Sequence, residues 1–212
     1  MSTDRPILWS FRRCPYAMRA RLSLHVAEIE IEHREILLRD KPAAMLDASP
    51  KGTIPILVLP DRTVIDESLD IMLWALRRHD PEAWLRNEAA ALALAHACDI
   101  EFKPHLDRYK YATRYDGADP DAHRTAAAEF VSELEARLKR SASLDGEHDG
   151  LADHAIFPFI RQYAHTDRDW FAGQDWPAVQ AWLTRHLNSG RFAEIMRKYP
   201  LWTPASDTHD AT

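Results

Sequence analysis

The 212-residue sequence predicts a small α/β domain followed by an all-helical domain. Short strand-like runs alternate with helical patterns as far as residue 78. From about residue 85 the strand signals end, and alanine-rich amphipathic segments follow. His79-Asp80-Pro81 is a natural linker between these two patterns. We therefore expect domains at residues 1–79 and 85–202 and a flexible tail at 203–212.

Within the first domain the expected order is β-α-β-α-β-β-α, which places helices on the faces of a small sheet. The expected elements are a strand at 6–9, a helix at 15–27, a strand at 33–37, a short helix at 42–48, hairpin strands at 54–59 and 63–65, and a helix after residue 66. Pro15 suits the first helical position, because the backbone N–H that proline lacks would have no hydrogen-bond partner within the helix there. Asp66 is expected to cap the last helix.

In the second domain the amphipathic patterns predict helices at 85–112, 121–142, 151–164, 177–188 and 190–198. The formal net charge is −6, so no overall basic field draws the chain to nucleic acid or to anionic membranes. No apolar run approaches the roughly 18 residues of a membrane span. Two cysteines do not form a secreted disulfide framework, so we expect a cytoplasmic protein.

One of the two cysteines, Cys14, directly precedes Pro15 and so becomes the N-cap of the first helix. A helix N-terminus and nearby arginines lower a thiol pKa and favour the reactive thiolate. Four arginines lie close in the sequence: Arg12, Arg13, Arg19 and Arg21. We therefore expect a reactive Cys14, the alternative being a buried and inert cysteine.

The site has a single thiol. Ala17 stands where a dithiol redox protein has its second cysteine, so an internal disulfide cannot form and any mixed disulfide needs an external thiol to resolve it. Cys98 lies in a helical stretch of the other domain, and we interpret it as a core residue.

The segment Cys14-Pro15-Tyr16-Ala17, leading into Arg21-Leu22, resembles the active-site turn of cysteine-type glutathione S-transferases, particularly the omega-like group. This resemblance implies a thioredoxin-like N-terminal domain before the helical domain, with glutathione as co-substrate. It implies that Pro15 and Tyr16 border the glutathione. Members of the family are commonly two-fold dimers, so a homodimer is expected.

Three further motifs support the resemblance and imply glutathione contacts. Lys51-Gly52-Thr53-Ile54-Pro55 is similar to the family's segment with a cis-proline, which implies that the Ile54 backbone pairs with the cysteinyl part of glutathione. Glu67 and Ser68 match the pair that binds the γ-glutamyl end, and Lys41 matches a lysine that binds the glycyl carboxylate. Without the family, these residues would read as a strand start, a helix cap and solvated surface.

Other residues are expected outside the glutathione contacts. Gly150-Leu151-Ala152-Asp153 is similar to the family's helix-starting motif, so we interpret Asp153 as structural. The eleven histidines and two cysteines show no metal-ligand spacing, and we expect no metal. Trp202 is expected to fold back over the cleft. The second substrate is expected between the domains, near Tyr16, His96, Asp99, Phe102 and Lys103.

The sequence leaves three functions open. The first is a glutathione-dependent thiol transferase, in which Cys14 attacks a small disulfide. The second is a transferase that conjugates glutathione to a small electrophile, with Cys14 as a bystander and Ser10 as a weak candidate for the activating hydroxyl. The third is a non-catalytic glutathione-binding or regulatory module, since a fold alone does not establish chemistry.

Overall fold

A four-stranded sheet forms the first part of the chain in the computed structural model, which describes residues 5–204. The strand order is β2-β1-β3-β4. The strands are β1 (Ile7–Ser10), β2 (Glu32–Glu35), β3 (Ile56–Val58) and β4 (Val64–Ile65). β2 runs parallel to β1, whereas β3 is antiparallel to both β1 and β4. Most of the predicted tail, residues 205–212, lies outside the described residues.

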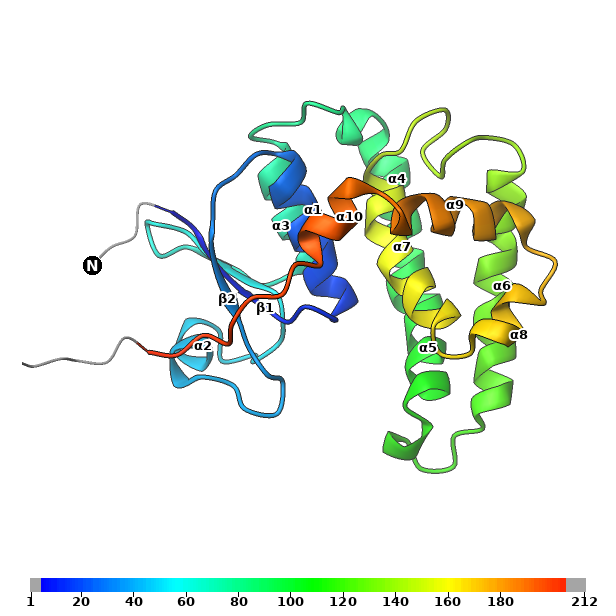
Figure 1. Cartoon of the computed structure of the whole chain (residues 1–212), viewed down its shortest axis with the longest axis horizontal. Helices are drawn as coiled ribbons and strands as arrows, with labels where there is room; N and C mark the ends of the chain where they lie inside the picture. Colours follow the sequence, from blue (N-terminus) through cyan, green and yellow to red (C-terminus); the bar gives the residue numbers. More distant parts are fainter. Residues whose placement is uncertain (1–4, 205–212) are drawn as a thin grey trace, which may run out of the picture.

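Three helices cover the two faces of this sheet (Figure 1). They are α1 (Pro15–Val26), α2 (Ala43–Ala48) and α3 (Ser68–Leu76). Successive side chains of a strand point to opposite faces, so Leu8 packs in the cluster of α1 and α3, whereas Trp9 packs with Met45 of α2. The predicted order of elements and the thioredoxin-like architecture are confirmed.

The start of α3 differs from the prediction. Glu67, not Asp66, is the N-cap residue, and no side chain caps this helix. The Asp66 carboxylate accepts a hydrogen bond from Ser49 Oγ at 2.7 Å instead. Asp66 lies one residue outside the cap, so its side chain supports the loop before β3 rather than the helix.

The second part of the chain is helical, as predicted. Its α-helices are α4 (Glu88–Ala97), α5 (Lys103–Lys110), α6 (Pro120–Leu138), α7 (Leu151–Ala164), α8 (Arg168–Ala172), α9 (Pro177–Leu187) and α10 (Gly190–Ile195). The helix expected at 85–112 is divided: a 3₁₀ turn (Trp84–Asn87) precedes α4, and a π-helical turn (Cys98–Phe102) joins α4 to α5. Pro104, which has no N–H to donate to the preceding turn, follows that π-helical turn. The short helix α8 was not predicted.

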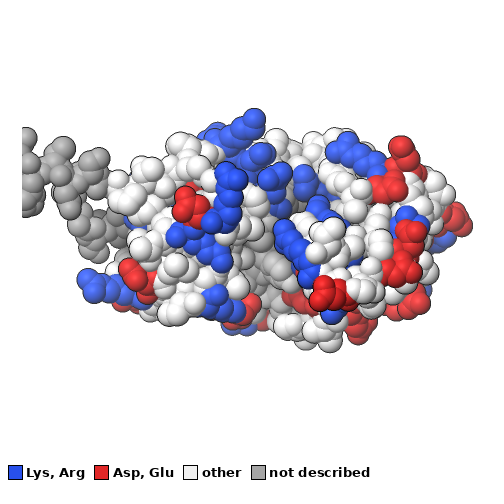
Figure 2. Space-filling view, turned by 90° about the horizontal axis from the view of Figure 1, so that it is seen from below, with Lys and Arg blue, Asp and Glu red and all other residues white. Residues whose placement is uncertain are grey.

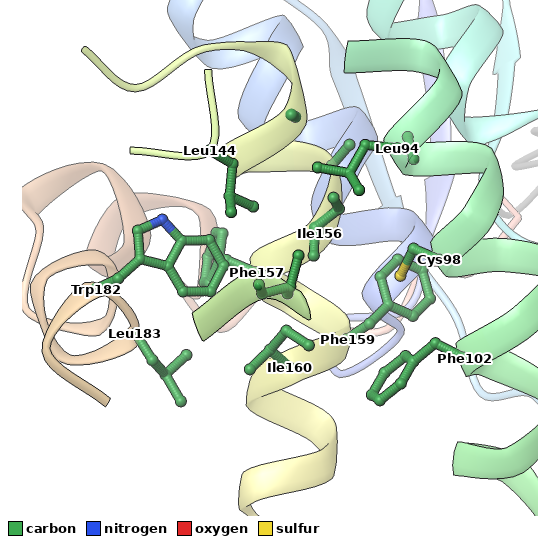
Figure 3. Close-up of a cluster of buried hydrophobic side chains, with 14 of the residues drawn as sticks. Leu94, Cys98, Phe102, Leu144, Ile156, Phe157, Phe159, Ile160, Trp182 and Leu183 are labelled. Carbon is green, nitrogen blue, oxygen red and sulfur yellow. The ribbon is translucent and has the colours of Figure 1, made fainter. Parts of the chain in front are cut away.

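Helix α7 lies at the centre of the helical part (Figures 1 and 3). Cys98 is fully buried among apolar side chains there, as predicted. Asp153 accepts hydrogen bonds from Gly150 N at 3.0 Å, Leu144 N at 2.8 Å and the Trp182 indole N–H at 2.8 Å, which confirms a structural role. No helix in residues 5–204 is both long and apolar enough to span a membrane.

Candidate active site

Cys14 lies where two distant segments of the first domain meet. The strand β1 ends at Ser10, and Cys14 follows as the N-cap of α1 with Pro15 in the first turn, as predicted. The thiol donates a weak hydrogen bond to the carbonyl of Ile54, with Sγ and O 3.8 Å apart. The Ile54–Pro55 peptide bond is cis, as the resemblance implied.

The pKa of the Cys14 thiol does not follow the prediction. Burial raises it above its ordinary value, although the backbone N–H groups of Ala17 and Tyr16 and the charges of Arg21 and Lys103 oppose that effect. The helix terminus therefore acts in the expected direction but is outweighed, because a half-buried sulfur loses the hydration that an anion needs. The expectation of a lowered pKa was wrong, because burial favours the neutral thiol over the thiolate.

The nearby arginines mostly serve the structure. Arg21 is buried and donates hydrogen bonds to Ser10 Oγ at 2.6 Å and to the carbonyl of Arg12 at 2.7 Å, so it holds the turn between β1 and α1. Burial lowers the pKa of Arg21 to about 10. Ser10, the candidate hydroxyl for glutathione activation, is fully buried and bound to Arg21. It therefore cannot serve as that hydroxyl.

The start of α3 borders the same region. Glu67 is exposed and forms an ion pair with Lys51. The Ser68 hydroxyl accepts a hydrogen bond from the buried Arg19 at 3.4 Å. Lys41 lies beside the same loop, because a Cβ added to Gly52 would lie 3.7 Å from the Lys41 ammonium nitrogen. Lys41 and Glu67 thus both reach the segment that leads to the cis-proline.

A cavity of about 680 Å³ opens beside Cys14, between α1 and the helical part. It is lined by Phe11, Arg13, Cys14, Pro15, Tyr16, Leu38, Lys103, Asp107, Lys110, Tyr111, Arg114, Tyr115, Arg161, Gln162 and His165. The predictions for Tyr16 and Lys103 agree with this lining.

Four other residues expected near the cleft lie elsewhere. Phe102 is fully buried in the core, and His96 is exposed outside the cavity lining. Asp99 forms an ion pair with Arg19 at 2.8 Å. Trp202 does fold back, but it packs on Trp9 with ring centroids 4.9 Å apart and lines a separate hollow beside α2.

The sequence analysis missed most of the basic residues of the cavity. Lys103, Asp107, Lys110 and Arg114 recur at spacings of four, three and four residues, which was a detectable sign of one helical face. Arg161 comes from α7 and His165 is the C-cap residue of that helix, some 50 residues later. No local pattern connects those residues to α5, so only the folded structure brings them together.

One group in the described residues could approach a metal ion: ligand atoms of Asp149, Asp153 and His186 lie within 4.8 Å of one another. The Asp153 oxygens already accept backbone and indole N–H groups, as described above. Asp149 accepts hydrogen bonds from Arg185 at 2.6 Å and from Ser143 at 2.5 Å. These donors occupy the carboxylates, so we interpret the group as structural.

Two family models match the chain. The model of the glutathione S-transferase N-terminal domain matches residues 8–83, and that of the C-terminal domain matches residues 95–189. The chain belongs to the glutathione S-transferase family. The chain is similar to pyrimidodiazepine synthase of Drosophila melanogaster, with 28% identity over 163 residues. That match covers 73% of this chain but 63% of the fly protein, less than two thirds of its length.

Solved glutathione S-transferase structures share the fold of this family member. A glutathione transferase of Phanerochaete chrysosporium in complex with oxidized glutathione has a TM-score of 0.79 at 15% identity, covering 91% of this chain and 94% of that chain. Glutathione S-transferase I bound with lactoylglutathione has a TM-score of 0.74 at 19% identity, covering 91% and 98%. At these identities the comparison establishes the fold.

Proposed function

We propose that this protein is a glutathione-dependent thiol transferase of the cysteine-type, omega-like group, with Cys14 as its nucleophile. The observation that carries the proposal is the position of Cys14: a lone thiol at the N-cap of α1, at the wall of the cavity, next to the cis-proline segment. Ser10 is bound to Arg21, which weakens the case for a hydroxyl-based transferase.

In this proposal glutathione lies along the first domain. Its cysteinyl backbone pairs with Ile54 beside Pro55, its ammonium faces Glu67, and its glycyl carboxylate faces Lys41. The Ser68 hydroxyl accepts a long hydrogen bond from Arg19, so its own O–H remains able to donate to the γ-glutamyl carboxylate. The Lys51–Glu67 ion pair is exposed, so rearranging it for the ammonium costs little.

Glutathione binding also offers a way to activate the Cys14 thiol, whose pKa burial raises. In the structure the Cys14 S–H donates to the Ile54 carbonyl. A glutathione N–H bound to that carbonyl competes for the same acceptor and removes a contact that favours the neutral thiol. The N–H groups of Tyr16 and Ala17, which favour the anion, remain in place.

The reaction has two displacement steps. The Cys14 thiolate attacks the glutathionyl sulfur of a mixed disulfide, the old S–S bond breaks, and its electron pair leaves on the other thiolate, which takes a proton from water. A second glutathione, as thiolate, then attacks the glutathionyl sulfur on Cys14. This step releases glutathione disulfide and restores the Cys14 thiolate, so the mixed disulfide is reduced and one added glutathione is oxidised, the other half of the product coming from the substrate.

The test is turnover of the glutathione–mercaptoethanol mixed disulfide. We expect Cys14→Ser to lower kcat/KM by at least about 100-fold, because a hydroxyl cannot replace a thiolate nucleophile in this exchange. Cys98→Ala is the control, since Cys98 is buried away from the cavity. Full activity in Cys14→Ser would contradict the nucleophile role.

One observation favours a second candidate, conjugation of glutathione to an electrophile. A neutral Cys14 thiol could donate a hydrogen bond to the glutathione thiolate without becoming the nucleophile. Conjugation of a chloronitrobenzene faster than thiol transfer would support this candidate. A lack of glutathione binding in calorimetry would instead indicate a non-catalytic module.

We also propose that the protein is a cytoplasmic homodimer. Sedimentation velocity tests the oligomeric state.

A further inference from the structure

The cavity beside Cys14 carries a strong excess of positive charge. Among the cations that line it, Lys103 is paired with Asp107. The other four, Arg13, Lys110, Arg114 and Arg161, form no ion pair with a carboxylate within residues 5–204. Figure 2 shows basic side chains gathered on both sides of the hollow between the two domains.

Burial and the charges of neighbouring arginines disfavour the protonated forms of Lys110 and Arg161. Burial and the charges of Arg161 and Arg13 lower the pKa of Lys110. Burial and the charges of Arg168 and Arg12 lower the pKa of Arg161. The Arg161 Nε is buried without an acceptor in the described part of the chain. Unpaired charges in a partly desolvated cavity are costly, and an anion bound there removes that cost.

Aromatic side chains line the same cavity. Tyr16, Tyr111 and Tyr115 contribute ring surfaces, and the Arg114 guanidinium lies 4.2 Å from the centroid of the Tyr111 ring. Rings of this kind pack against a flat aromatic ligand, and a guanidinium binds a carboxylate with two parallel hydrogen bonds. The cavity therefore offers faces for a ring together with cations for its charged substituent.

We propose that the second substrate is an aromatic carboxylate joined through sulfur to glutathione. This inference rests on the proposed function and names the substrate class of its second site. The glutathionyl part lies along the first domain, and the carboxylated ring occupies the basic cavity. In the first displacement the breaking S–S bond leaves its electron pair on the aryl sulfur, where the same cations stabilise the developing negative charge.

Binding is tested without the chemistry of Cys14. Two thioethers of equal size serve as probes: S-(4-carboxybenzyl)glutathione and the uncharged S-(4-carbamoylbenzyl)glutathione. By calorimetry we expect the acid to bind about tenfold more tightly at low salt, with the difference shrinking in high salt as the cavity charges are screened. Equal affinities for the acid and the amide would overturn the inference.

The residues are tested by neutralising them. Lys110→Gln combined with Arg161→Gln should remove most of the preference for the acid. If this double variant does not fold, Arg114→Gln replaces it, because Arg114 is exposed. Arg140 is exposed in the turn after α6 and lies outside the cavity lining, so Arg140→Gln is the matched control and should keep the preference. Unchanged preference in the cavity variants would overturn the assignment.

Turnover supplies an independent readout. The mixed disulfides of glutathione with 4-mercaptobenzoate and 4-mercaptobenzamide differ in the same single charge. We expect kcat/KM to favour the acid in the unmodified protein, and this ratio to fall in Arg114→Gln. An equal or lower kcat/KM for the acid would contradict the inference. S-methylglutathione, which has no ring, separates the two proposals: its failure to bind would refute the proposed function itself.

Discussion

Opposing interactions act on the sulfur of Cys14. Its position at the N-cap of α1 brings the N–H groups of Tyr16 and Ala17 to bear on it, yet burial raises its pKa. The hydrogen bond to the Ile54 carbonyl uses the proton that a nucleophile must lose. These contacts together favour the neutral thiol of Cys14. The proposed function requires that bound glutathione shift the equilibrium toward the thiolate.

The first prediction concerns that shift. A thiolate absorbs near 240 nm, so the difference between the native protein and Cys14→Ser reports the titration of this thiol. We expect a midpoint above the ~8.5 of a free cysteine without ligand, because burial disfavours the anion. With S-methylglutathione, which cannot react, the midpoint should fall. A ligand-free midpoint below about 7, within the range of activated cysteines, would contradict this expectation.

Helices of the two parts are joined through one buried cation. Arg19 of α1 donates to the carbonyl of Ala155 in α7 at 2.6 Å and pairs with Asp99 in the π-helical turn at 2.8 Å. Its guanidinium lies 4.3 Å from the centroid of the Phe159 ring. Because Arg19 also donates to Ser68, it connects α1 with α3, α7 and the π-helical turn.

The second prediction follows from this arrangement. Arg19→Ala should lower the free energy of unfolding by about 3–5 kcal/mol, because it leaves Asp99 and the Ala155 carbonyl without their partner in a buried setting. Urea unfolding measures the change. Arg197→Ala, which breaks the exposed Arg197–Glu194 pair, is the control and should cost about 1 kcal/mol or less. A comparable loss in both variants would contradict the assignment.

At the scale of the whole molecule, one apolar cluster spans both parts. Met18 and Leu22 of α1 and Met72 of α3 belong to the same buried cluster as the core residues of α7. This shared core excludes water from titratable groups within it. Burial lowers the pKa of His186 to about 4 and that of His154 well below its ordinary value, whereas it raises the pKa of Asp153 to about 6.

The third prediction is a loss of stability in acid. Between pH 6.5 and 4 the unfolded chain binds protons on His154 and His186 that the folded chain does not, so folding weakens as the pH falls. Asp153 opposes this trend, because its folded form holds the proton more tightly than the unfolded form. His165, whose pKa burial also lowers to about 4, acts in the same direction as the two core histidines. With these histidines against Asp153, we expect a net loss of stability of roughly 1 kcal/mol per pH unit.

Urea unfolding at pH 7, 6 and 5 measures that slope. His186→Phe keeps a ring against Phe157, on which the His186 ring stacks with centroids 4.9 Å apart, and it should reduce the slope. Stability that is equal or higher at pH 5 than at pH 7 would show that the buried histidines do not control the acid response.

Most of the fold could be predicted because its signals are local. Apolar spacing and turn residues gave the order of strands and helices through α3, and Pro15 placed the start of α1. The π-helical turn and the interaction of Asp66 with Ser49 could not be predicted in this way. The Ser49–Asp66 hydrogen bond joins residues 17 positions apart, and the apolar spacing of residues 85–112 does not distinguish a π-helical turn from an α-helix.

The sequence by itself determined that Cys14 caps a helix, that no second thiol stands beside it, and that a proline follows Ile54. Tertiary structure decided the direction of the thiol pKa shift, since desolvation depends on every segment packed around the sulfur. It also decided the charge of the cavity, which joins residues of α5 with residues of α7. Helix capping is set by adjacent residues, whereas burial and electric fields arise only when distant residues come together.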